Sequence, residues 1–379
     1  MPETERADAP ARVVLVGGTG FTGGLVARAL GDAGLPFLLT GRDPARLRRR
    51  AGELGGGPPT RRVDVTEPAT LAGCLRPGDV VVDCAGPFTE LGEAVVETCV
   101  RAGAHVVDTT GEQRYMMRIR DGWHARARRA GVAVVNALAF EYALGDCAAE
   151  LAADGLARPL RRLEVVYGWR GDAAATTPGT RASIVRVMAR RGWALADGEW
   201  RLEPTARRRG RARLPGGAVR DVISFPAGEV VTVPRHLDVR TVRGWLVTGS
   251  ATARAASFLS PVLPPAARLL TPILDRLARR GPEGPTEEQR RRGRFDIVVT
   301  AEGDDGELRT LGLSGRDPYG LTATLAARGA GALLARSRGD GGPSGVLAPA
   351  ELLDARELLE GLRSQGLEVA EAPGAGPPA

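Results

Sequence analysis

Short apolar runs recur along the first 140 residues, and segments with helical spacing separate them. Runs this short and continuous are typical of parallel strands that are buried on both faces. The predicted strands are Arg12–Val16, Phe37–Thr40, Thr60–Asp64, Asp79–Asp83, His105–Asp108 and Val132–Val135. The predicted helices are Thr22–Gly31, Pro44–Leu54, Gly92–Ala102 and Arg114–Ala130. This regular alternation predicts an α/β fold whose N-terminal part is a doubly wound parallel sheet of the Rossmann type.

The pattern changes after Phe140, where several strand-like runs alternate in polarity. Alternation suits an antiparallel sheet with one covered face, so we expect a second, α+β domain that contains a mixed or antiparallel sheet. Its predicted strands are Leu163–Trp169, Val219–Phe225, Val230–Val233, Trp245–Ser250, Phe295–Glu302 and Glu307–Gly315. Its predicted helices are Arg181–Arg191, Ala266–Arg280, Leu321–Ser337 and Pro349–Arg363. The expected organisation is a flexible leader (1–11), a first domain (12–142), a second domain (143–345) with a linker over Gly281–Arg294, and a disordered tail (371–379).

The stretch VVLVGGTGFTGGLVARAL, residues 13–30, joins the first predicted strand to the first predicted helix. Gly18, Gly20 and Gly23 fit the pattern G-x-G-x-x-G, and Gly17, Gly20 and Gly23 fit G-x-x-G-x-x-G. Glycine permits a tight turn and a close approach of a pyrophosphate to the main chain, and the helix N-terminus supplies unpaired N–H groups. A purely structural turn is the alternative. We expect a dinucleotide cofactor to be bound by Gly17, Gly18, Thr19, Gly20, Phe21, Thr22 and Gly23.

The end of the second predicted strand bears on the choice of dinucleotide. An NAD site usually carries Asp or Glu there, whereas this chain has Thr40, with Arg42 two residues later. A guanidinium beside the ribose pairs with a 2′-phosphate, which favours NADP (NADPH). Two alternatives stay open: Asp43 takes the role of the acid, or Arg42 caps a helix.

Two further segments are candidate cofactor contacts because they follow predicted strands. Asp64 and Val65, in RRVDV, lie where the adenine amino group is met. Backbone groups after the fourth strand commonly line the nicotinamide half of the cofactor. The residues in that place, in DCAGPF, are Cys84, Ala85, Gly86 and Pro87.

Candidate acids lie beyond the fifth and sixth predicted strands and near the start of a later helix. Ligands of a doubly wound sheet lie off the carboxyl ends of its strands. Asp108 and Glu112 follow the fifth strand, so either of them is a candidate proton donor. The alternative is that the residue only caps the N-terminus of the next helix. Tyr142 and Tyr319 are further candidate catalytic acids, each with the alternative that its ring only packs. His236, one of 3 histidines, is a further candidate for catalysis, and a purely structural role is the alternative.

The composition excludes several kinds of site. All 52 basic residues are arginine, so the chain has no Schiff-base lysine, no Walker-type phosphate loop and no Tyr-x-x-x-Lys pair. There is no His-x-x-x-His motif and no Cys/His cluster, so we expect no metal. Arginine clusters at 46–50, 207–213 and 290–294 are interpreted as solvated charge and not as a nucleic-acid site. Attraction for an acidic partner or an anionic substrate is a further alternative.

The cysteines and the apolar runs bear on the compartment. Cys74, Cys84, Cys99 and Cys147 form no CxxC pair and lie in apolar segments, as is typical of reduced thiols in a cytoplasmic protein. No apolar run approaches the roughly 20 residues that span a bilayer, so we expect no membrane span.

Several of these segments together resemble the saccharopine dehydrogenase-like NADP-binding oxidoreductase family, and within it the bacterial trans-acting enoyl reductases. The segments are GGTGFTG (17–23), LLTGRDPARL (38–47), VVVDCAGPFTELGEAVVETCVRAGAHVVDTTGE (80–112) and GVAVVNALAFEYALGD (131–146). Similar later segments are PGTRASIV (178–185), FPAGEVVTVPRHL (225–237), GRDPYGLTATLAARGAGALL (315–334) and GVLAPAELL (345–353). The resemblance covers most of the chain.

The resemblance implies an NADP-dependent reductase that transfers hydride to an activated C=C or C=N of a natural-product or lipid intermediate. It implies a small-molecule or carrier-protein-bound substrate, and a C-terminal helix (346–370) that returns to the dinucleotide-binding domain. The alternatives are an enzyme that acts on a free small molecule and a regulator that binds NADP without turnover. A homodimer stays open.

Overall fold

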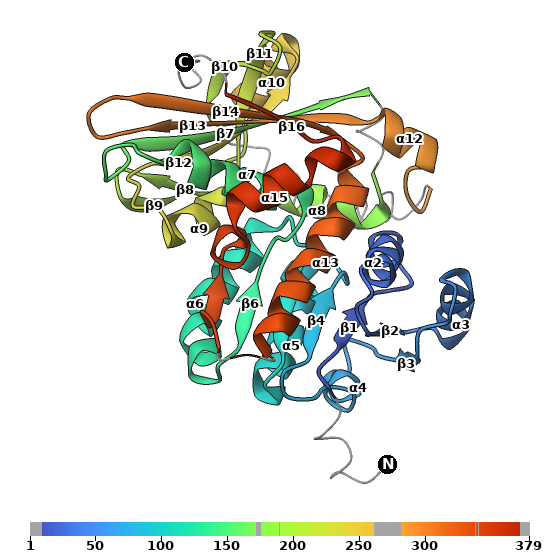
Figure 1. Cartoon of the computed structure of the whole chain (residues 1–379). Coiled ribbons are helices and arrows are strands. Elements are labelled where there is room, and N and C mark those ends of the chain that lie inside the picture. The colour runs from blue at the N-terminus through green and yellow to red at the C-terminus, as the bar shows by residue number, and fades with distance from the viewer. Residues whose placement is uncertain are drawn as a thin grey trace. The chain divides into compact units, whose positions relative to one another are not determined.

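The computed structural model describes residues 10–171, 176–188, 190–260, 282–337, 339 and 341–371. The chain divides into two compact units (Figure 1). Unit 1 comprises Met1–Thr110, Tyr115–Phe140 and Tyr319–Leu352, and unit 2 comprises Gly111–Arg114, Glu141–Pro318 and Leu353–Ala379. Most of the predicted leader, the predicted tail beyond 371 and the predicted helix Ala266–Arg280 lie outside the described residues.

Unit 1 is built on a parallel sheet, as predicted. The order of its seven strands is β15-β6-β5-β4-β1-β2-β3, and every recorded pairing is parallel. The strands are β1 Val13–Val16, β2 Phe37–Gly41, β3 Thr60–Arg62, β4 Val80–Asp83, β5 His105–Asp108, β6 Ala133–Val135 and β15 Gly345–Leu347. The side chains of β1 are at most 2% exposed. Continuous apolar strands are therefore buried on both faces here.

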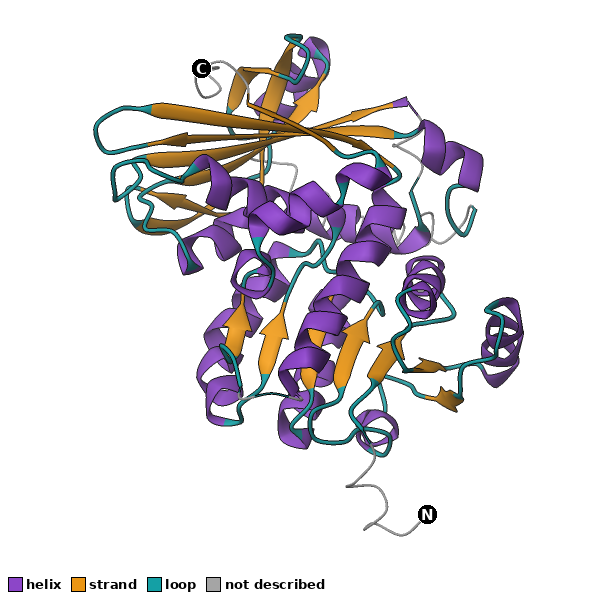
Figure 2. Cartoon of the chain, in the orientation of Figure 1, coloured by secondary structure: helices purple, strands orange, loops and turns teal. Residues whose placement is uncertain are grey.

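Helices flank this sheet (Figure 2). They are α2 Phe21–Asp32, α3 Pro44–Glu53, α4 Pro68–Ala72, α5 Phe88–Ala102, α6 Gln113–Arg129, α13 Pro318–Ser337 and α14 Pro349–Leu352. The segment that returns to the nucleotide unit differs from the predicted helix over 346–370. It is α13 with β15, and β15 pairs with β6 at the edge of the sheet.

Unit 2 is built on a nine-stranded sheet. Seven of its strands have the order β10-β11-β12-β7-β13-β14-β16, β8 pairs with β12, and β9 pairs with β8. The pairing of β12 with β7 is parallel and the other recorded strand pairings are antiparallel, so the predicted mixed sheet is confirmed. The strands are β7 Arg162–Arg170, β8 Gly192–Ala196, β9 Glu199–Glu203, β10 Arg209–Arg213, β11 Val219–Phe225, β12 Val242–Thr248, β13 Arg294–Glu302, β14 Leu308–Arg316 and β16 Glu368–Glu371.

The helices of unit 2 are α7 Phe140–Ala152, α8 Pro178–Met188, α9 Glu229–Thr232, α10 Ser250–Leu259, α12 Glu287–Arg292 and α15 Ala355–Gly361, with 3-10 turns η2 Val233–Arg235 and η3 Arg363–Gln365. The predicted strand Val230–Val233 is wrong, because these residues form α9 and the start of η2. Short buried apolar runs are common to strands and helices, and periodicity does not separate them. The predicted linker Gly281–Arg294 contains α12, which begins with a capping box from Thr286 and Gln289.

The predicted helix Pro349–Arg363 is wrong as a single element. It is divided into α14 and α15 by Asp354, whose side chain accepts the N–H of Glu357 and so caps the second helix. The chain then continues into β16, which pairs with β14 in the sheet of unit 2.

Among the described residues, no helix is both long and apolar enough to cross a membrane.

Candidate functional site

The turn between β1 and α2 is packed too tightly for side chains at two of its glycines. A Cβ atom on Gly23 would lie 2.2 Å from the carbonyl oxygen of Gly17. Gly17 itself has φ +76°, and a Cβ there would lie 3.0 Å from the backbone of Cys84. The N–H of Gly20 donates to the carbonyl of Gly17 over 2.9 Å and closes the turn. These contacts explain why glycine is required at both positions.

The N-terminus of α2 is free to bind an anion. Gly20 is its exposed N-cap residue and no side chain caps the helix. The first turn contains no acidic residue. A Cβ on Gly20 would meet only the Gly17 oxygen, at 3.3 Å, so the outer side of the turn is open. Unpaired N–H groups and the positive end of a 12-residue helix fit the pyrophosphate of a dinucleotide.

Two arginines lie near the end of β2. Arg42 is exposed, and it is close enough to Asp64 to contribute to a lowered pKa of that carboxyl. Arg46, on the first turn of α3, donates from Nη2 to the carbonyl of Thr19 in the glycine turn over 3.3 Å. The sequence analysis singled out Arg42 and missed Arg46. Arg46 could have been identified from the sequence, because it lies four residues after Arg42 at the start of a predicted helix.

Asp43 is the N-cap of α3. Its Oδ1 accepts the N–H groups of Ala45 and Arg46, at 2.8 and 3.2 Å, and these two bonds lower the pKa of the carboxyl. The alternative in which Asp43 binds the ribose hydroxyls is weakened, because one oxygen is committed to the helix. Arg42 is the residue before this cap and does not cap the helix itself.

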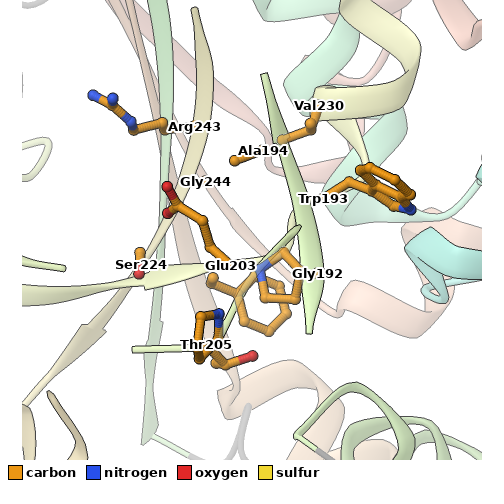
Figure 3. Close-up of a pocket in the computed structure, with 12 residues that line it drawn as sticks. Gly192, Trp193, Ala194, Glu203, Thr205, Ser224, Val230, Arg243 and Gly244 are labelled. Atoms are coloured by element: carbon orange, nitrogen blue, oxygen red, sulfur yellow. The ribbon is translucent and has the colours of Figure 1, made fainter. Parts of the chain in front are cut away.

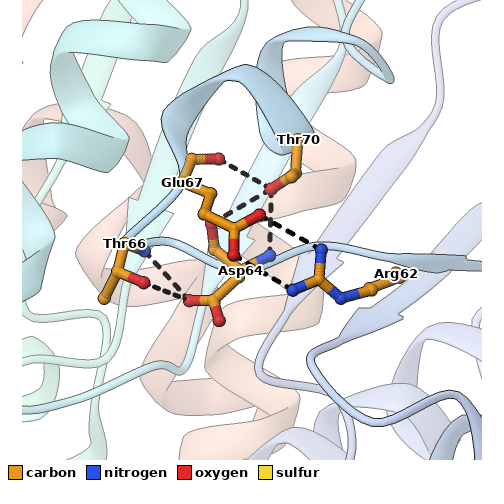
Figure 4. A network of polar contacts seen from close by, with 5 residues as sticks. All are labelled: Arg62, Asp64, Thr66, Glu67 and Thr70. Carbon is orange, nitrogen blue, oxygen red and sulfur yellow. Dashed lines mark hydrogen bonds and ion pairs between the residues drawn. The ribbon is translucent and has the colours of Figure 1, made fainter.

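Asp64 is held in a local network after β3 (Figure 4). Its Oδ1 accepts the N–H and the hydroxyl of Thr66, at 3.1 and 2.8 Å, and these bonds are the main cause of its lowered pKa. Nearby, Arg62 pairs with Glu67 at 3.1 Å. The carboxyl of Asp64 remains half-buried, and Val65 is buried. Their assignment to the adenine stays a prediction.

The segment after β4 turns back toward the glycine turn. The N–H of Cys84 donates to the carbonyl of Val16 over 3.0 Å, and the N–H of Ala85 donates to Asp83 Oδ1 over 2.8 Å. Gly86 is exposed, and Pro87 is the N-cap of α5. Burial raises the pKa of the Cys84 thiol, so this thiol is neutral. This segment offers backbone groups, as expected, and its contact with the nicotinamide stays a prediction.

Asp108, a predicted catalytic acid, is fully buried and bound by four donors. Its Oδ1 accepts the N–H groups of Thr110 and Ala137, and its Oδ2 accepts the Tyr115 hydroxyl at 3.0 Å and the Asn136 amide at 2.5 Å. Burial raises its pKa to about 6 in spite of these donors. A carboxyl with every lone pair occupied is suited to holding the loops after β5 and β6, so the geometry favours the positioning role.

Tyr142, a second predicted acid, packs inside unit 2. It is 3% exposed, and its hydroxyl lies 3.4 Å from the carbonyl oxygen of Gly111. Its ring meets the Tyr167 ring with centroids 6.1 Å apart, and Gly228 lies against its face. Burial raises the pKa of Tyr142 far above its usual value. This environment favours the packing role.

Tyr319, the third predicted acid, lies at the first turn of α13 and is half-exposed. Its ring contacts the ring of Phe21 from the glycine turn, within unit 1. The structure therefore brings Tyr319 beside the predicted cofactor residues, while Tyr142 belongs to unit 2.

His236 is a largely buried residue that pairs with two carboxylates. Its Nδ1 lies 2.7 Å from Glu150 Oε2 and its Nε2 lies 3.1 Å from Asp146 Oδ1, both on α7. Burial alone would lower its pKa, but the two carboxylates outweigh burial and raise it to about 9. The structural alternative is favoured for this histidine. Glu112 is buried and accepts the Ser183 hydroxyl at 2.8 Å.

Within the described part of the chain, no cluster of three or more His, Cys, Asp or Glu side chains is arranged to hold a metal. A cavity of about 30 Å³ lies in unit 2 among β8, β11 and β12 (Figure 3). That volume accommodates roughly one water molecule, so this cavity is too small for a substrate.

Comparison with known proteins agrees with the resemblance seen in the sequence. Residues 13–138 match the family model described as the saccharopine dehydrogenase NADP binding domain. The chain is 34% identical over 134 residues to a trans-acting enoyl reductase of Mycobacterium ulcerans, covering 34% of this chain and 32% of the relative. It is 28% identical over 149 residues to the human saccharopine dehydrogenase-like oxidoreductase, covering 35% of each. The chain spans less than half the length of the curated relatives it matches.

The fold is also found in a solved structure. Apo saccharopine dehydrogenase (L-Glu forming) from Saccharomyces cerevisiae superimposes with a TM-score of 0.57 at 13% identity, covering 96% of this chain and 100% of the other. This solved structure shows the fold alone. The predicted resemblance and the predicted NADP cofactor are confirmed by the family model over residues 13–138 and by the curated relatives.

Proposed function

We propose that this chain, whose residues 13–138 match the model of the saccharopine dehydrogenase NADP binding domain, is an NADPH-dependent reductase of an activated C=C or C=N. The preferred substrate is an enoyl or enone group in a natural-product or lipid intermediate. The enoyl reductase and oxidoreductase names of the relatives support this class of reaction. The observation that carries the proposal is the open, uncapped N-terminus of α2, with Arg46 bonded to Thr19 in the turn before it.

Different residues of this chain have different roles in such a reaction. The N–H groups of the turn Gly17–Gly23 would bind the pyrophosphate, and Arg42 with Arg46 would bind the 2′-phosphate. The backbone of Cys84–Pro87 would contact the nicotinamide half, and Asp64 with Val65 would contact the adenine. NADPH, when bound, supplies the two electrons of the reduction as a hydride from its nicotinamide. A protein acid supplies the proton, and Tyr319 is a candidate because its ring lies at the glycine turn.

The chain also offers a surface for an acidic carrier protein. β10 is an end strand of the sheet of unit 2, and its outward residues Arg209, Arg211 and Arg213 are all exposed. Arg209 and Arg211 have no salt-bridge partner among the described residues. We propose that a carrier-bound substrate is delivered through this strand. Exposed charge on an edge strand also discourages aggregation, which is the simpler role.

The test is titration of the purified protein with NADPH and NADH, followed by NADPH consumption with a panel of enones, enoyl thioesters and cyclic imines. Binding of NADPH with reduction of an enone or imine supports the proposal. Binding of NADPH without turnover of any of these groups favours a cofactor-sensing regulator. Absence of NADPH binding contradicts both.

A further inference from the structure

Two buried carboxyls end neighbouring strands of the sheet of unit 1. Asp83 is the last residue of β4 and Asp108 is the last residue of β5, and the two residues are partners in the parallel register. Their side chains therefore lie on the same face of the sheet. Asp83 is 1% exposed and Asp108 is 0% exposed. Two carboxyls placed in this way, out of contact with water, cannot both be ionised at low cost.

The two carboxyls differ in their hydrogen-bond donors. Asp108 accepts two backbone N–H groups and two side-chain donors. Asp83 accepts the N–H of Ala85 at its Oδ1, over 2.8 Å. Its other oxygen, Oδ2, is buried and has no hydrogen-bond partner among the described residues. Donors stabilise a carboxylate, so the negative charge of the pair belongs on Asp108 and the proton on Asp83.

The other titratable groups that face Asp83 are neutral. They are the thiol of Cys84, the thiol of Cys99 on α5 and the hydroxyl of Tyr115 on α6, and burial raises the pKa of all three. No arginine is recorded as interacting with Asp83 in the part of the chain that the structure describes. Burial raises the pKa of Asp83 to about 8, and the charge of Asp108 adds to this rise. Asp108, with a pKa of about 6, therefore ionises before Asp83 as pH increases.

Asp83 lies at the contact between the loop after β4 and the glycine turn. A Cβ atom on Gly17 would lie 3.0 Å from the backbone of Cys84, the residue that follows Asp83. The Asp83 carboxyl is bonded to the N–H of Ala85 inside the same loop. All of these residues belong to unit 1. This loop, Cys84–Pro87, is the segment that is expected to contact the nicotinamide half of the cofactor.

We propose that Asp83 is a proton-linked residue that sets the balance between oxidised and reduced cofactor, an inference that rests on the cofactor half of the proposed function. The nicotinamide ring of NADP⁺ carries a positive charge, and the ring of NADPH is neutral. A neutral Asp83 does not distinguish the two rings by charge, whereas an ionised Asp83 attracts only the cationic ring. Ionisation of Asp83 therefore favours NADP⁺. By linkage, the exchange of NADPH for NADP⁺ promotes release of the Asp83 proton.

The ratio of the two cofactor affinities isolates this effect. The pyrophosphate, the adenine and the 2′-phosphate are common to both forms, so their contacts and their titration cancel in the ratio. A merely structural role of Asp83 changes both affinities alike and also cancels. In the unmutated protein the affinity for NADP⁺ relative to NADPH should rise about three- to tenfold as pH increases from about 7 to about 9. The cause is that Asp83 ionises through about 8, while Asp108 is already ionised in this range.

The experiment measures the dissociation constants of NADPH and NADP⁺ across this pH range at constant ionic strength. NADPH is titrated by its fluorescence, and NADP⁺ is titrated by displacement of NADPH. The proteins compared are the unmutated chain, Asp83→Asn and the control Asp121→Asn, which changes an exposed residue of α6 that pairs with Arg120. Asparagine keeps an oxygen for the N–H of Ala85 and carries no charge at any pH. The ratio should be independent of pH in Asp83→Asn and should follow the unmutated protein in the control.

The outcomes separate the two proposals. A ratio that stays constant from pH 7 to pH 9 in the unmutated protein overturns the role of Asp83, and this measurement needs no variant. A pH-dependent ratio that persists in Asp83→Asn, with the fold verified by thermal melts, also overturns it. A protein that binds neither NADPH nor NADP⁺ overturns the proposed function. Binding of both forms without reduction of any substrate overturns only the proposed reaction, and the ratio still decides on Asp83.

Discussion

The ring of Tyr319 meets the ring of Phe21 edge to face, with centroids 5.2 Å apart and planes at 84°. Phe21 begins α2 in the glycine turn, and Tyr319 lies in the first turn of α13, near the other end of the chain. The helix α13, which is distant in sequence, therefore packs against the residues that are expected to hold the cofactor. Aromatic pairs of this geometry contribute about 0.5–1.5 kcal/mol beyond their buried area.

The two parts of Tyr319 can be tested separately. Tyr319→Ala removes the ring and should weaken NADPH binding by a few-fold, with a loss of stability of about 1 kcal/mol. Tyr319→Phe keeps the ring and should leave affinity unchanged. If the Tyr319 ring only packs, kcat of Tyr319→Phe should also be nearly unchanged. A large loss of kcat in Tyr319→Phe would identify the Tyr319 hydroxyl as the proton donor instead.

Arg42 and Arg46 should determine the preference for NADPH over NADH. A charge-assisted bond to a phosphate contributes about 1.5–3 kcal/mol, or roughly ten- to a hundredfold in affinity. Arg42→Ala should lose most of the NADPH preference and Arg46→Ala part of it, with NADH binding nearly unchanged. Arg48→Ala, an exposed change on the same helix, is the control. Cofactor titration by fluorescence measures this, and equal affinity of the unmutated protein for both cofactors would contradict it.

Two glycines of the turn should respond differently to substitution. Gly20→Val places a side chain where the pyrophosphate must lie, but its nearest neighbour is at 3.3 Å, so the fold should survive while NADPH binding is lost. Gly23→Ala puts a Cβ atom 2.2 Å from the Gly17 oxygen and should destabilise the protein by about 1–3 kcal/mol. Circular dichroism melts and NADPH titration separate the two effects. A Gly20→Val variant with normal affinity would show that the turn is only structural.

His236 should make stability depend on pH. Its folded pKa of about 9 lies above the ordinary 6.5, so the stabilisation by Asp146 and Glu150 is fully present below pH 6.5. It is lost as pH rises through about 9, and a difference of this size corresponds to about 3 kcal/mol. His236→Asn should therefore be most destabilising at low pH and converge on the unmutated protein at high pH. Urea melts across this range test the prediction, and a constant difference would refute it.

The arginines of β10 should matter only for a carrier-bound substrate. Arg209→Gln combined with Arg211→Gln should raise KM for a substrate on an acidic carrier protein and leave kcat nearly unchanged. High salt should have the same effect, because attraction is screened over about 8 Å at physiological ionic strength. Free substrate should respond to neither. Arg129→Gln, on α6, is the control. Equal salt responses of the two substrate forms would remove the carrier hypothesis.

Local pattern in the sequence was enough to predict unit 1 and its cofactor. Strands buried on both faces must be continuously apolar, and Gly23 is required by a contact with Gly17, six residues earlier, so these features follow from local sequence. Gly17 is required by its positive φ and also by the backbone of Cys84, which is distant in sequence. The longer strands of the mixed sheet of unit 2 were also predicted, but the short strands β8, β9, β10 and β16 were not. Arg42 could be proposed as a cofactor residue because its place after β2 follows from chain order alone, and that role stays a prediction.

What the tertiary structure decided depends on contacts between distant segments. Val230–Val233 forms a helix, because a short apolar run takes the form that its packing partners favour. Asp108 and Tyr142 have the right chemistry for an acid, but their environments occupy or bury the reacting groups. Burial and the pairing of a titratable group depend on which segments meet, and the order of residues along the chain does not reveal that.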